Sequence, residues 1–242
     1  MASIGYKDLL DAGVHFGHMK KKWNPKMQPY IFMERKGIHI IDLNRTLQCM
    51  ETSANAFRSI AKSGRKILFV ATKKQARDIV KEAAESVNMP YVTERWLGGM
   101  MTNFSTIRRS VKKMQNIDRM LDDGSLSSIT KKERLTLSRE KLKLEKVLSG
   151  IADLTRIPAA VYIVDITHEH IALTEANKLG LRTFALVDTN SNPNLVDFPI
   201  PANDDASKSI HVITNYMTEA IKEGLADRSK TQEELTETTA ES

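Results

Sequence analysis

Aspartate and histidine side chains follow several short apolar runs of this sequence, at positions where acid–base or metal chemistry could take place. The residues in such positions are Asp165, His168, Asp188, Asp204 and Asp205. In an open α/β sheet, ligands bind beyond the carboxyl ends of the strands. This placement raises the hypothesis of a hydrolase that uses a metal ion or a general-base histidine.

The sequence lacks the further patterns that such an enzyme needs. It contains no H-E-x-x-H helix, no G-x-S-x-G elbow and no recognised phosphate loop. Aspartate and histidine after a strand also cap helices and orient loops, and we favour that interpretation. We therefore expect no enzymatic activity and no required cofactor. A structural divalent cation held by His18, Asp188, Asp204 and Asp205 stays open as an alternative.

The segment RWLGGMMTNF (95–104) resembles the entrance to an active site, because two adjacent glycines follow a cation and an indole. A glycine-rich phosphate loop would need a G-x-G-x-x-G or G-x-x-x-x-G-K-[ST] spacing, which is absent. We interpret Gly98 and Gly99 as a sharp bend, with Thr102 or Asn103 as the cap of a following helix. Valine at either glycine is then expected to misdirect that helix.

The segment MKKKWNPKMQPYIF (19–32) interleaves lysines with aromatic side chains around two prolines. Lysines neutralise phosphates and aromatic rings stack on unpaired bases, so this pattern is compatible with an RNA-binding arm. The alternative is an extended arm whose aromatic rings pack on the domain while its lysines are solvated.

Apolar β-branched runs alternate with amphipathic helix patterns along the rest of the chain. The expected strands are 37–42, 66–72, 91–94, 159–165, 182–188 and the short 198–202, and the expected helices are 43–62, 73–88, 169–179 and 204–224. This alternation predicts βαβ units in a doubly wound, mainly parallel sheet, Rossmann-like or flavodoxin-like. Continuous apolar runs such as ILFVA indicate strands that are covered on both faces.

Residues 105–151 interrupt this pattern with two apolar stripes at helical spacing, which predict an inserted antiparallel coiled-coil hairpin. The stripe residues are Ile107, Val111, Met114, Leu121, Leu137, Leu144, Leu148 and Ile151. DDGSLSS supplies the turn, and Thr130 followed by Glu133 is a capping-box pattern. Twelve cations and six acids lie in this insertion.

Composition favours a polyanionic partner, because the formal net charge is +6. Residues 227–242 are acidic and poor in apolar side chains, so they are expected to be a disordered tail. Cys49 is the only cysteine and lies in a helix-like stretch, where a packing role is favoured over thiol chemistry. No signal-peptide pattern or long apolar run is present, so we expect a soluble cytoplasmic protein without a membrane partner.

Five segments together resemble one known family, the bacterial small-subunit ribosomal proteins conventionally numbered two. They are GVHFGHMKKKWNPKM, RWLGGMMTNF, KKERLTLSREKLKLEKVLSGI, VDITHEHIALTEANKLGL and FALVDTNSNP. The resemblance runs from about Tyr6 to Gly224. It implies an α/β domain with an inserted hairpin that lies between the head and body of the small subunit, contacts ribosomal RNA, and helps to recruit the large RNA-binding ribosomal protein numbered one.

We therefore expect an α/β domain (1–104 and 152–226) with a basic N-terminal arm, an inserted hairpin (105–151) and an acidic tail (227–242). The expected partners are small-subunit ribosomal RNA and other ribosomal proteins, without self-association. The residues expected to contact RNA are Lys20, Lys21, Lys22, Trp23, Lys26, Arg95, Trp96, Arg108, Arg109, Lys112, Lys113, Lys131, Lys132 and Arg134.

Overall fold

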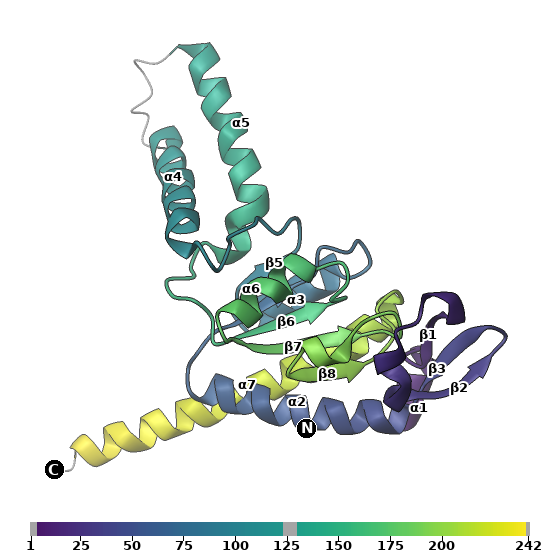
Figure 1. Cartoon of the computed structure of the whole chain (residues 1–242). Helices are drawn as coiled ribbons and strands as arrows, with labels where there is room; N and C mark the ends of the chain where they lie inside the picture. Colours follow the sequence, from purple (N-terminus) through teal and green to yellow (C-terminus); the bar gives the residue numbers. More distant parts are fainter. Residues whose placement is uncertain (1–3, 123–129, 241–242) are drawn as a thin grey trace.

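A five-stranded parallel sheet forms the centre of the chain in a computed structural model, which describes residues 4–122 and 130–240 (Figure 1). Its strands are β4 (Ile67–Val70), β5 (Tyr91–Val92), β6 (Ala160–Val164), β7 (Arg182–Val187) and β8 (Phe198–Pro201), in the order β5-β4-β6-β7-β8. All four pairings are parallel. Every residue of β4 and β6 is buried, as their continuous apolar sequences predict. The predicted doubly wound α/β fold is confirmed.

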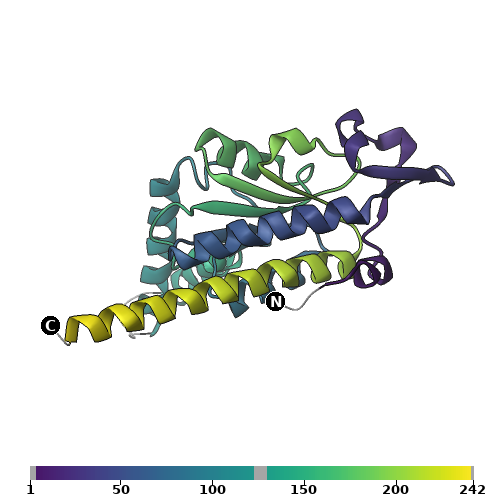
Figure 2. The same cartoon turned by 90° about the horizontal axis from the view of Figure 1, so that it is seen from below.

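Helices cover both faces of this sheet. Three helices, α2 (Leu43–Lys62), α3 (Arg77–Ser86) and the first part of α7 (Ser207–Ala240), pack with the short α1 (Tyr6–Asp11) on one face. The other face is covered by α6 (His170–Lys178) and by the base of the inserted hairpin. Figure 2 shows α2 and α7 side by side beneath the sheet. Two apolar layers therefore hold the strand ends at fixed positions.

A second, three-stranded antiparallel sheet lies beside the first (Figure 1). It consists of β1 (Phe16–Met19), β2 (Ile31–Arg35) and β3 (Ile38–Ile41), in the order β1-β3-β2. The prediction that residues 37–42 begin the parallel sheet is wrong. Lys36 and Gly37 join β2 to β3 with φ values of 51° and 76°, as in a two-residue type I′ hairpin. A parallel pair would instead need a long crossover connection.

The basic segment 19–32 belongs to this small sheet and is not an extended arm. After β1 it forms two 3-10 helices, η1 (Lys20–Lys22) and η2 (Pro25–Tyr30). Met27 of η2 is fully buried, and the backbone N–H of Asn24 donates to the carbonyl oxygen of Thr189 at 2.7 Å. These contacts attach the lysine-rich segment to the end of β7.

The insertion consists of α4 (Phe104–Asp122) and α5 (Lys131–Leu148), which lie side by side and project from the domain (Figure 1). Ile107, Val111 and Met114 of the predicted stripe are buried, as is Leu148 at the base of the second helix. The Thr130 side chain accepts from the N–H of Glu133 at 3.4 Å, as the capping pattern predicts. The predicted turn lies largely outside the described residues. A helical hairpin is therefore present, while coiled-coil packing stays a prediction.

The end of α7 differs from the predicted disorder, since the helix continues to Ala240 (Figure 2). Among the side chains of α7 that the structure describes, which end at Thr231, Gly224 is the last buried residue, and Leu225 packs partly on the core. A helix that is already nucleated by a buried segment extends at low cost through Glu, Gln and Lys, which are good helix formers. Among the described residues, no helix is long and apolar enough to cross a membrane.

Candidate functional site

Lys73, immediately beyond β4, is the centre of a charge cluster at the carboxyl edge of the parallel sheet. Its Nζ lies 3.1 Å from Asp165 Oδ2, 2.8 Å from Asp204 Oδ1 and 2.7 Å from Asp205 Oδ1. Asp165 follows β6, and the two neighbouring aspartates follow β8. The topology thus brings together the acids that the sequence pattern indicated, around a lysine that no sequence pattern indicated.

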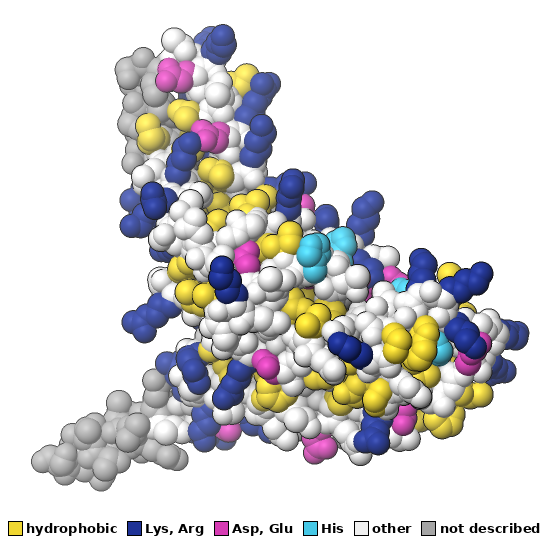
Figure 3. Space-filling model, in the orientation of Figure 1, with side chains coloured by type: hydrophobic (Ala, Val, Ile, Leu, Met, Phe, Trp, Pro, Cys, Tyr) yellow, Lys and Arg dark blue, Asp and Glu magenta, His cyan; other side chains and the backbone are white. Residues whose placement is uncertain are grey.

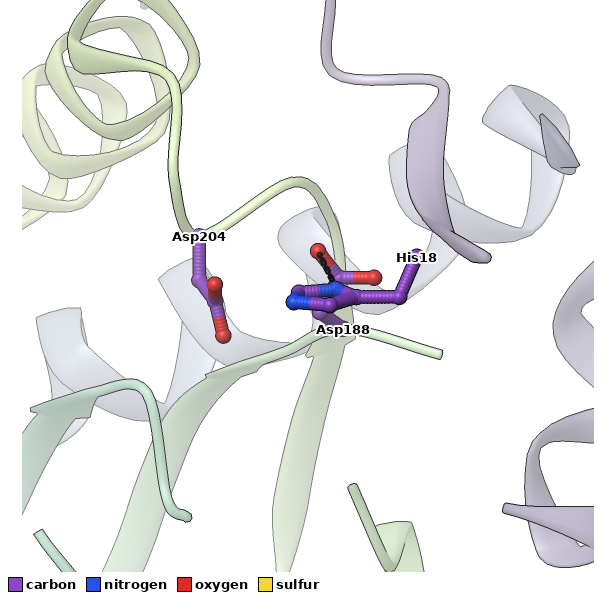
Figure 4. Close-up of side chains that lie close together, drawn as sticks. All are labelled: His18, Asp188 and Asp204. Carbon is purple, nitrogen blue, oxygen red and sulfur yellow. Dashed lines mark ion pairs between the residues drawn. The ribbon is translucent and has the colours of Figure 1, made fainter. Parts of the chain in front are cut away.

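His18 enters the same cluster from the three-stranded sheet. Its Nδ1 lies 3.0 Å from Asp188 Oδ2, and its backbone N–H donates to Thr189 Oγ1 at 2.8 Å. Gly17 permits this approach, because a Cβ there would lie 2.6 Å from Thr189 Cγ2. Figure 4 shows the His18 ring beside the carboxylate of Asp188 and directed toward Asp204.

Burial and mutual repulsion make this a place that favours added positive charge. Burial raises the pKa of Asp204 to about 7, with further contributions from the negative charges of Asp165 and Asp188. The hydrogen bond to Asp188 raises the pKa of His18. Burial acts to lower the pKa of Lys73, but its aspartate partners outweigh burial and raise that pKa. One oxygen of Asp204, Oδ2, is buried without a hydrogen-bond partner among the described residues.

A divalent cation fits the residues of this cluster. His18, Asp188 and Asp204 each offer a ligand atom within 4.8 Å of the others. One imidazole nitrogen and two carboxylates form a donor set that zinc accepts, and the unpartnered Asp204 oxygen has the matching charge. Asp205, also predicted as a ligand, instead pairs with Lys73, and its Oδ2 lies 3.5 Å from His18 Nε2.

The geometry gives no support to the hydrolase hypothesis. His168 and His170 are exposed and do not join the cluster. Asp165 Oδ1 accepts the backbone N–H groups of Thr167 and His168, both at 3.0 Å, which is the predicted capping role. Lys73 is occupied by three carboxylates. Cys49 is half-buried in α2, where burial raises the pKa of its thiol and disfavours the reactive thiolate.

The RWLGGMMT segment does bind an anion, and that anion is the side chain of Glu175 from α6. Glu175 Oε1 accepts from Trp96 Nε1 at 3.0 Å and from the N–H of Gly99 at 2.7 Å. Its Oε2 accepts from the N–H groups of Met101 and Thr102 and from Thr102 Oγ1, each at 3.0 Å. Burial acts to raise the pKa of Glu175, but these hydrogen bonds outweigh it and hold that pKa below its ordinary value.

The predicted bend is confirmed at Gly99 alone. Its φ is +86°, in the left-handed region, and its N–H faces Glu175. Gly98 has an ordinary φ and open space at the position of a Cβ. The following turn leads directly to Phe104, the first residue of α4. This segment therefore fixes where the hairpin leaves the domain.

Most of the residues expected to contact RNA are exposed on two basic surfaces, the hairpin and the β1–β2 segment. The exposed members on these surfaces are Lys20, Lys21, Lys22, Lys26, Arg109, Lys112, Lys113, Lys131, Lys132 and Arg134. Arg95 is also exposed, in the loop that follows β5. Figure 3 shows Lys and Arg side chains along the hairpin and around the three-stranded sheet. Two of them have acidic neighbours: Lys20 pairs with Glu34 at 2.8 Å, and Lys113 pairs with Glu140.

Three of the expected RNA contacts have partners within the protein, and for the buried Trp96 this is a correction. Trp96 is only 8% exposed and donates to Glu175, so it stabilises the bend and cannot stack on a base. Arg108 Nη1 donates to the carbonyl oxygens of Ala152 at 3.0 Å and Leu154 at 2.9 Å, which ties the two ends of the insertion together. Trp23 is half-buried, with its ring 5.1 Å from that of His39.

Comparison with known proteins assigns the chain to a family. The model of the family described as ribosomal protein S2 matches residues 9–224. A relative from Cytophaga hutchinsonii named small ribosomal subunit protein uS2 is 61% identical over 231 residues, which cover 96% of this chain and 91% of the relative. The protein of the same name from Flavobacterium psychrophilum is 60% identical over 235 residues, covering 97% and 88%. The one from Parabacteroides distasonis is 56% identical over 228 residues, covering 94% and 82%.

Proposed function

Because the chain belongs to the ribosomal protein S2 family, we propose that it is a structural component of the small ribosomal subunit that binds ribosomal RNA and supports translation in the cytoplasm. Its relatives are named as proteins of that subunit. The family consists of ribosomal proteins and not of enzymes, which agrees with the expectation that the chain has no catalytic activity.

The observation that carries the RNA-binding proposal is the exposure of the basic hairpin. Arg109 and Lys112 on α4, and Lys131, Lys132 and Arg134 on α5, are all exposed and have no ion-pair partner among the described residues. Such side chains neutralise phosphates without selecting a base sequence. The hairpin projects from the domain, so it can reach RNA that the α/β domain does not contact (Figure 1).

Sedimentation of a tagged copy of the full chain from a cell lysate tests the proposal. We expect the chain to travel with the small subunit at low and moderate salt. A chain that stays with free proteins at low salt, while a tagged protein of the subunit moves with the particle, would contradict it.

The finer part of the proposal is that the chain helps to recruit the ribosomal protein numbered one. Support for a protein partner comes from apolar side chains exposed on α1 and on the three-stranded sheet. The exposed apolar side chains of these elements are Tyr6, Leu10, Phe16, Met19, Phe32, Met33 and Ile38. By strand register, Phe16, Met19, Met33 and Ile38 share one face of the small sheet, which is the candidate surface. Exposed apolar groups on adjoining elements are typical of protein interfaces. Serine at Phe16 and Met33 should reduce co-purification of that protein and leave RNA binding unchanged. Equal retention by parent and variant would contradict this surface.

We also propose that His18, Asp188 and Asp204 hold a structural divalent cation. When bound, the cation would offset the carboxylate repulsion at the sheet edge and link β1 to the ends of β7 and β8. Zinc added after chelation should raise the melting temperature of the parent and not that of Asp188→Asn, since only a ligand that binds the folded state stabilises it. An equal rise in both proteins would argue against the site.

A further inference from the structure

A cleft of about 640 Å³ lies at the point where the parallel sheet reverses its strand order. From β4 the chain moves to β5 at one edge, and it then crosses back to β6 on the other side of β4. Loops at the carboxyl ends of neighbouring strands diverge at such a point and leave a crevice in which ligands bind. The cleft is lined by the segments that follow β4, β5 and β6, including Thr72, Arg95 and His168.

The lining of this cleft carries positive charge that the described residues leave unpaired. Lys74 and Arg95 are exposed and have no hydrogen-bond or ion-pair partner among the described side chains. Arg77 also lines the cleft, and its Nη1 lies 3.6 Å from Glu94 Oε2. A ligand that meets Lys74 and Arg95 together would therefore be an anion.

The backbone donors of the cleft limit which anion can bind. Glu169 is 3% exposed, and its Oε1 accepts the N–H of Thr72 at 2.7 Å and Thr72 Oγ1 at 2.6 Å. The protein's own carboxylate thus takes the backbone N–H at the end of β4, which a tightly bound di- or triphosphate would use. The exposed cationic side chains of Lys74 and Arg95 still offer donors, and such side chains suit the single charge of a phosphodiester.

One wall of the cleft is apolar, and its rim continues to the hairpin. Ile171 is 45% exposed and lines the cleft, so it offers a face against which a base can lie. Glu94 lies at the rim and forms an ion pair with Lys146 of α5, with 3.3 Å between Glu94 Oε2 and Lys146 Nζ. An RNA strand on the basic hairpin can therefore reach the cleft without leaving the protein surface.

We propose that this cleft, at the switch point between β4 and β6, binds one nucleotide of an RNA strand, with the phosphate between Lys74 and Arg95 and the base against Ile171. The proposal rests on the proposed RNA-binding function, and it adds a site on the α/β domain to the hairpin surface.

The test compares the full chain with two charge-matched double variants. The cleft variant is Lys74→Ala with Arg95→Ala. The control variant is Lys62→Ala with Lys178→Ala. It removes two exposed lysines at the ends of α2 and α6, near the amino ends of the strands and away from the cleft at their carboxyl ends. Binding of a 12-nucleotide oligouridine is measured from low to moderate salt, and melting temperatures show that all three proteins fold.

We expect the cleft variant to bind the oligonucleotide roughly tenfold more weakly at low salt, with a salt dependence shallower by about 0.7 in log–log slope, because the contact to one phosphate of a single strand is lost. The control variant should bind the oligonucleotide with the affinity and salt dependence of the parent. In the parent, the oligonucleotide should protect Lys74 and not Lys62 from amine acylation. Equal weakening in both variants would show that only diffuse charge acts and would overturn the cleft.

Adenosine monophosphate distinguishes a strand from a free nucleotide. Both ligands are compared at equal phosphate concentration. If the monophosphate protects Lys74 from acylation as strongly as oligouridine does, the assignment to an RNA strand is overturned. Failure of the parent to travel with the small subunit would instead refute the proposed function. If the parent travels with the small subunit but the cleft and control variants bind RNA equally well, only the proposed nucleotide site in the cleft is refuted.

Discussion

Glu175 shows how one buried side chain gives a loop its shape. Its carboxylate accepts five hydrogen bonds from Trp96, Gly99, Met101 and Thr102, whose segment has no regular secondary structure. A carboxylate is suited to this role because it only accepts hydrogen bonds and carries charge. The loop resembles an anion-binding site because it is one, and the protein supplies the anion.

Glu175→Gln should lower the free energy of unfolding by about 2 kcal/mol or more, since the amide group would turn N–H donors toward the N–H groups of the loop. Glu82→Gln, at an exposed position of α3, is the control and should have little effect. Urea unfolding of both variants measures the difference. A Glu175→Gln protein as stable as its control would show that the loop holds its shape without the charge.

The same pair of proteins predicts a pH dependence. The pKa of Glu175 lies below its ordinary value of 4.5 in the folded state, so ionised Glu175 stabilises the fold fully above pH 4.5. That contribution is lost as the pH falls through the lower, folded-state pKa. The stability difference between parent and Glu175→Gln should thus be constant near neutral pH and shrink in acid. A difference that grew in acid would have the wrong sign.

Gly98 and Gly99 should respond differently to valine, contrary to the expectation from sequence that both are needed. At Gly99 a side chain must adopt φ +86°, and its Cβ would lie 3.3 Å from Asn103 Cβ. This strain costs about 1–2 kcal/mol or more for a β-branched residue. Gly98 has nothing within 4 Å of an added Cβ. Thermal melting should show a loss for Gly99→Val and little change for Gly98→Val; equal losses would refute this distinction.

The basic hairpin is the element for which charge and structure can be separated by substitution. Glu at both Arg109 and Lys112 should leave the melting temperature unchanged and weaken RNA binding, because both side chains are exposed. Arg108→Ala should instead destabilise the protein by about 2 kcal/mol, because Arg108 bonds to the carbonyl groups of Ala152 and Leu154. Melting and RNA titration of both variants check this; a fully stable Arg108→Ala protein would contradict it.

Helix α7 packs on the domain through its first part, and the described side chains after it become more exposed. Burial ends at Gly224 and Leu225, while Arg228 still lies over Gly64, whose Cβ would be 2.5 Å from Arg228 Cζ. Truncation after Lys230 should therefore leave the melting temperature and incorporation into the small subunit unchanged. Truncation after Asp227 also removes the Arg228 contact and should cost some stability. If truncation after Lys230 abolished incorporation into the small subunit, the removed end of the helix would have a binding partner there.

At the scale of the whole molecule, exposed cations lie on two separate surfaces, the helical hairpin and the β1–β2 segment (Figure 3). Binding spread over many phosphate contacts releases counterions, so affinity for small-subunit ribosomal RNA should fall steeply with salt. Titrations from low to moderate salt measure the slope. An affinity that does not change with salt would exclude binding dominated by phosphate contacts.

The sequence by itself determined the local elements, because each depends on neighbours in the chain. Apolar runs placed β4, β6 and β7, helical periodicity placed α2 and the hairpin stripe, and lysine content marked the exposed surfaces. Residues 37–42, which contain β3, were assigned to the wrong sheet because a short apolar run does not reveal whether its partner is parallel.

Only the tertiary structure decided which distant residues meet. His18 reaches Thr189 and Asp188 across 171 and 170 positions of the chain, and Glu175 reaches Trp96 across 79. Lys73 gains three carboxylate partners solely because parallel strands end at one edge of the sheet. The same packing turned Trp96 and Arg108 from expected RNA contacts into internal ones. Residue type sets what a side chain can bind, but the path of the chain between such residues decides which partner it finds.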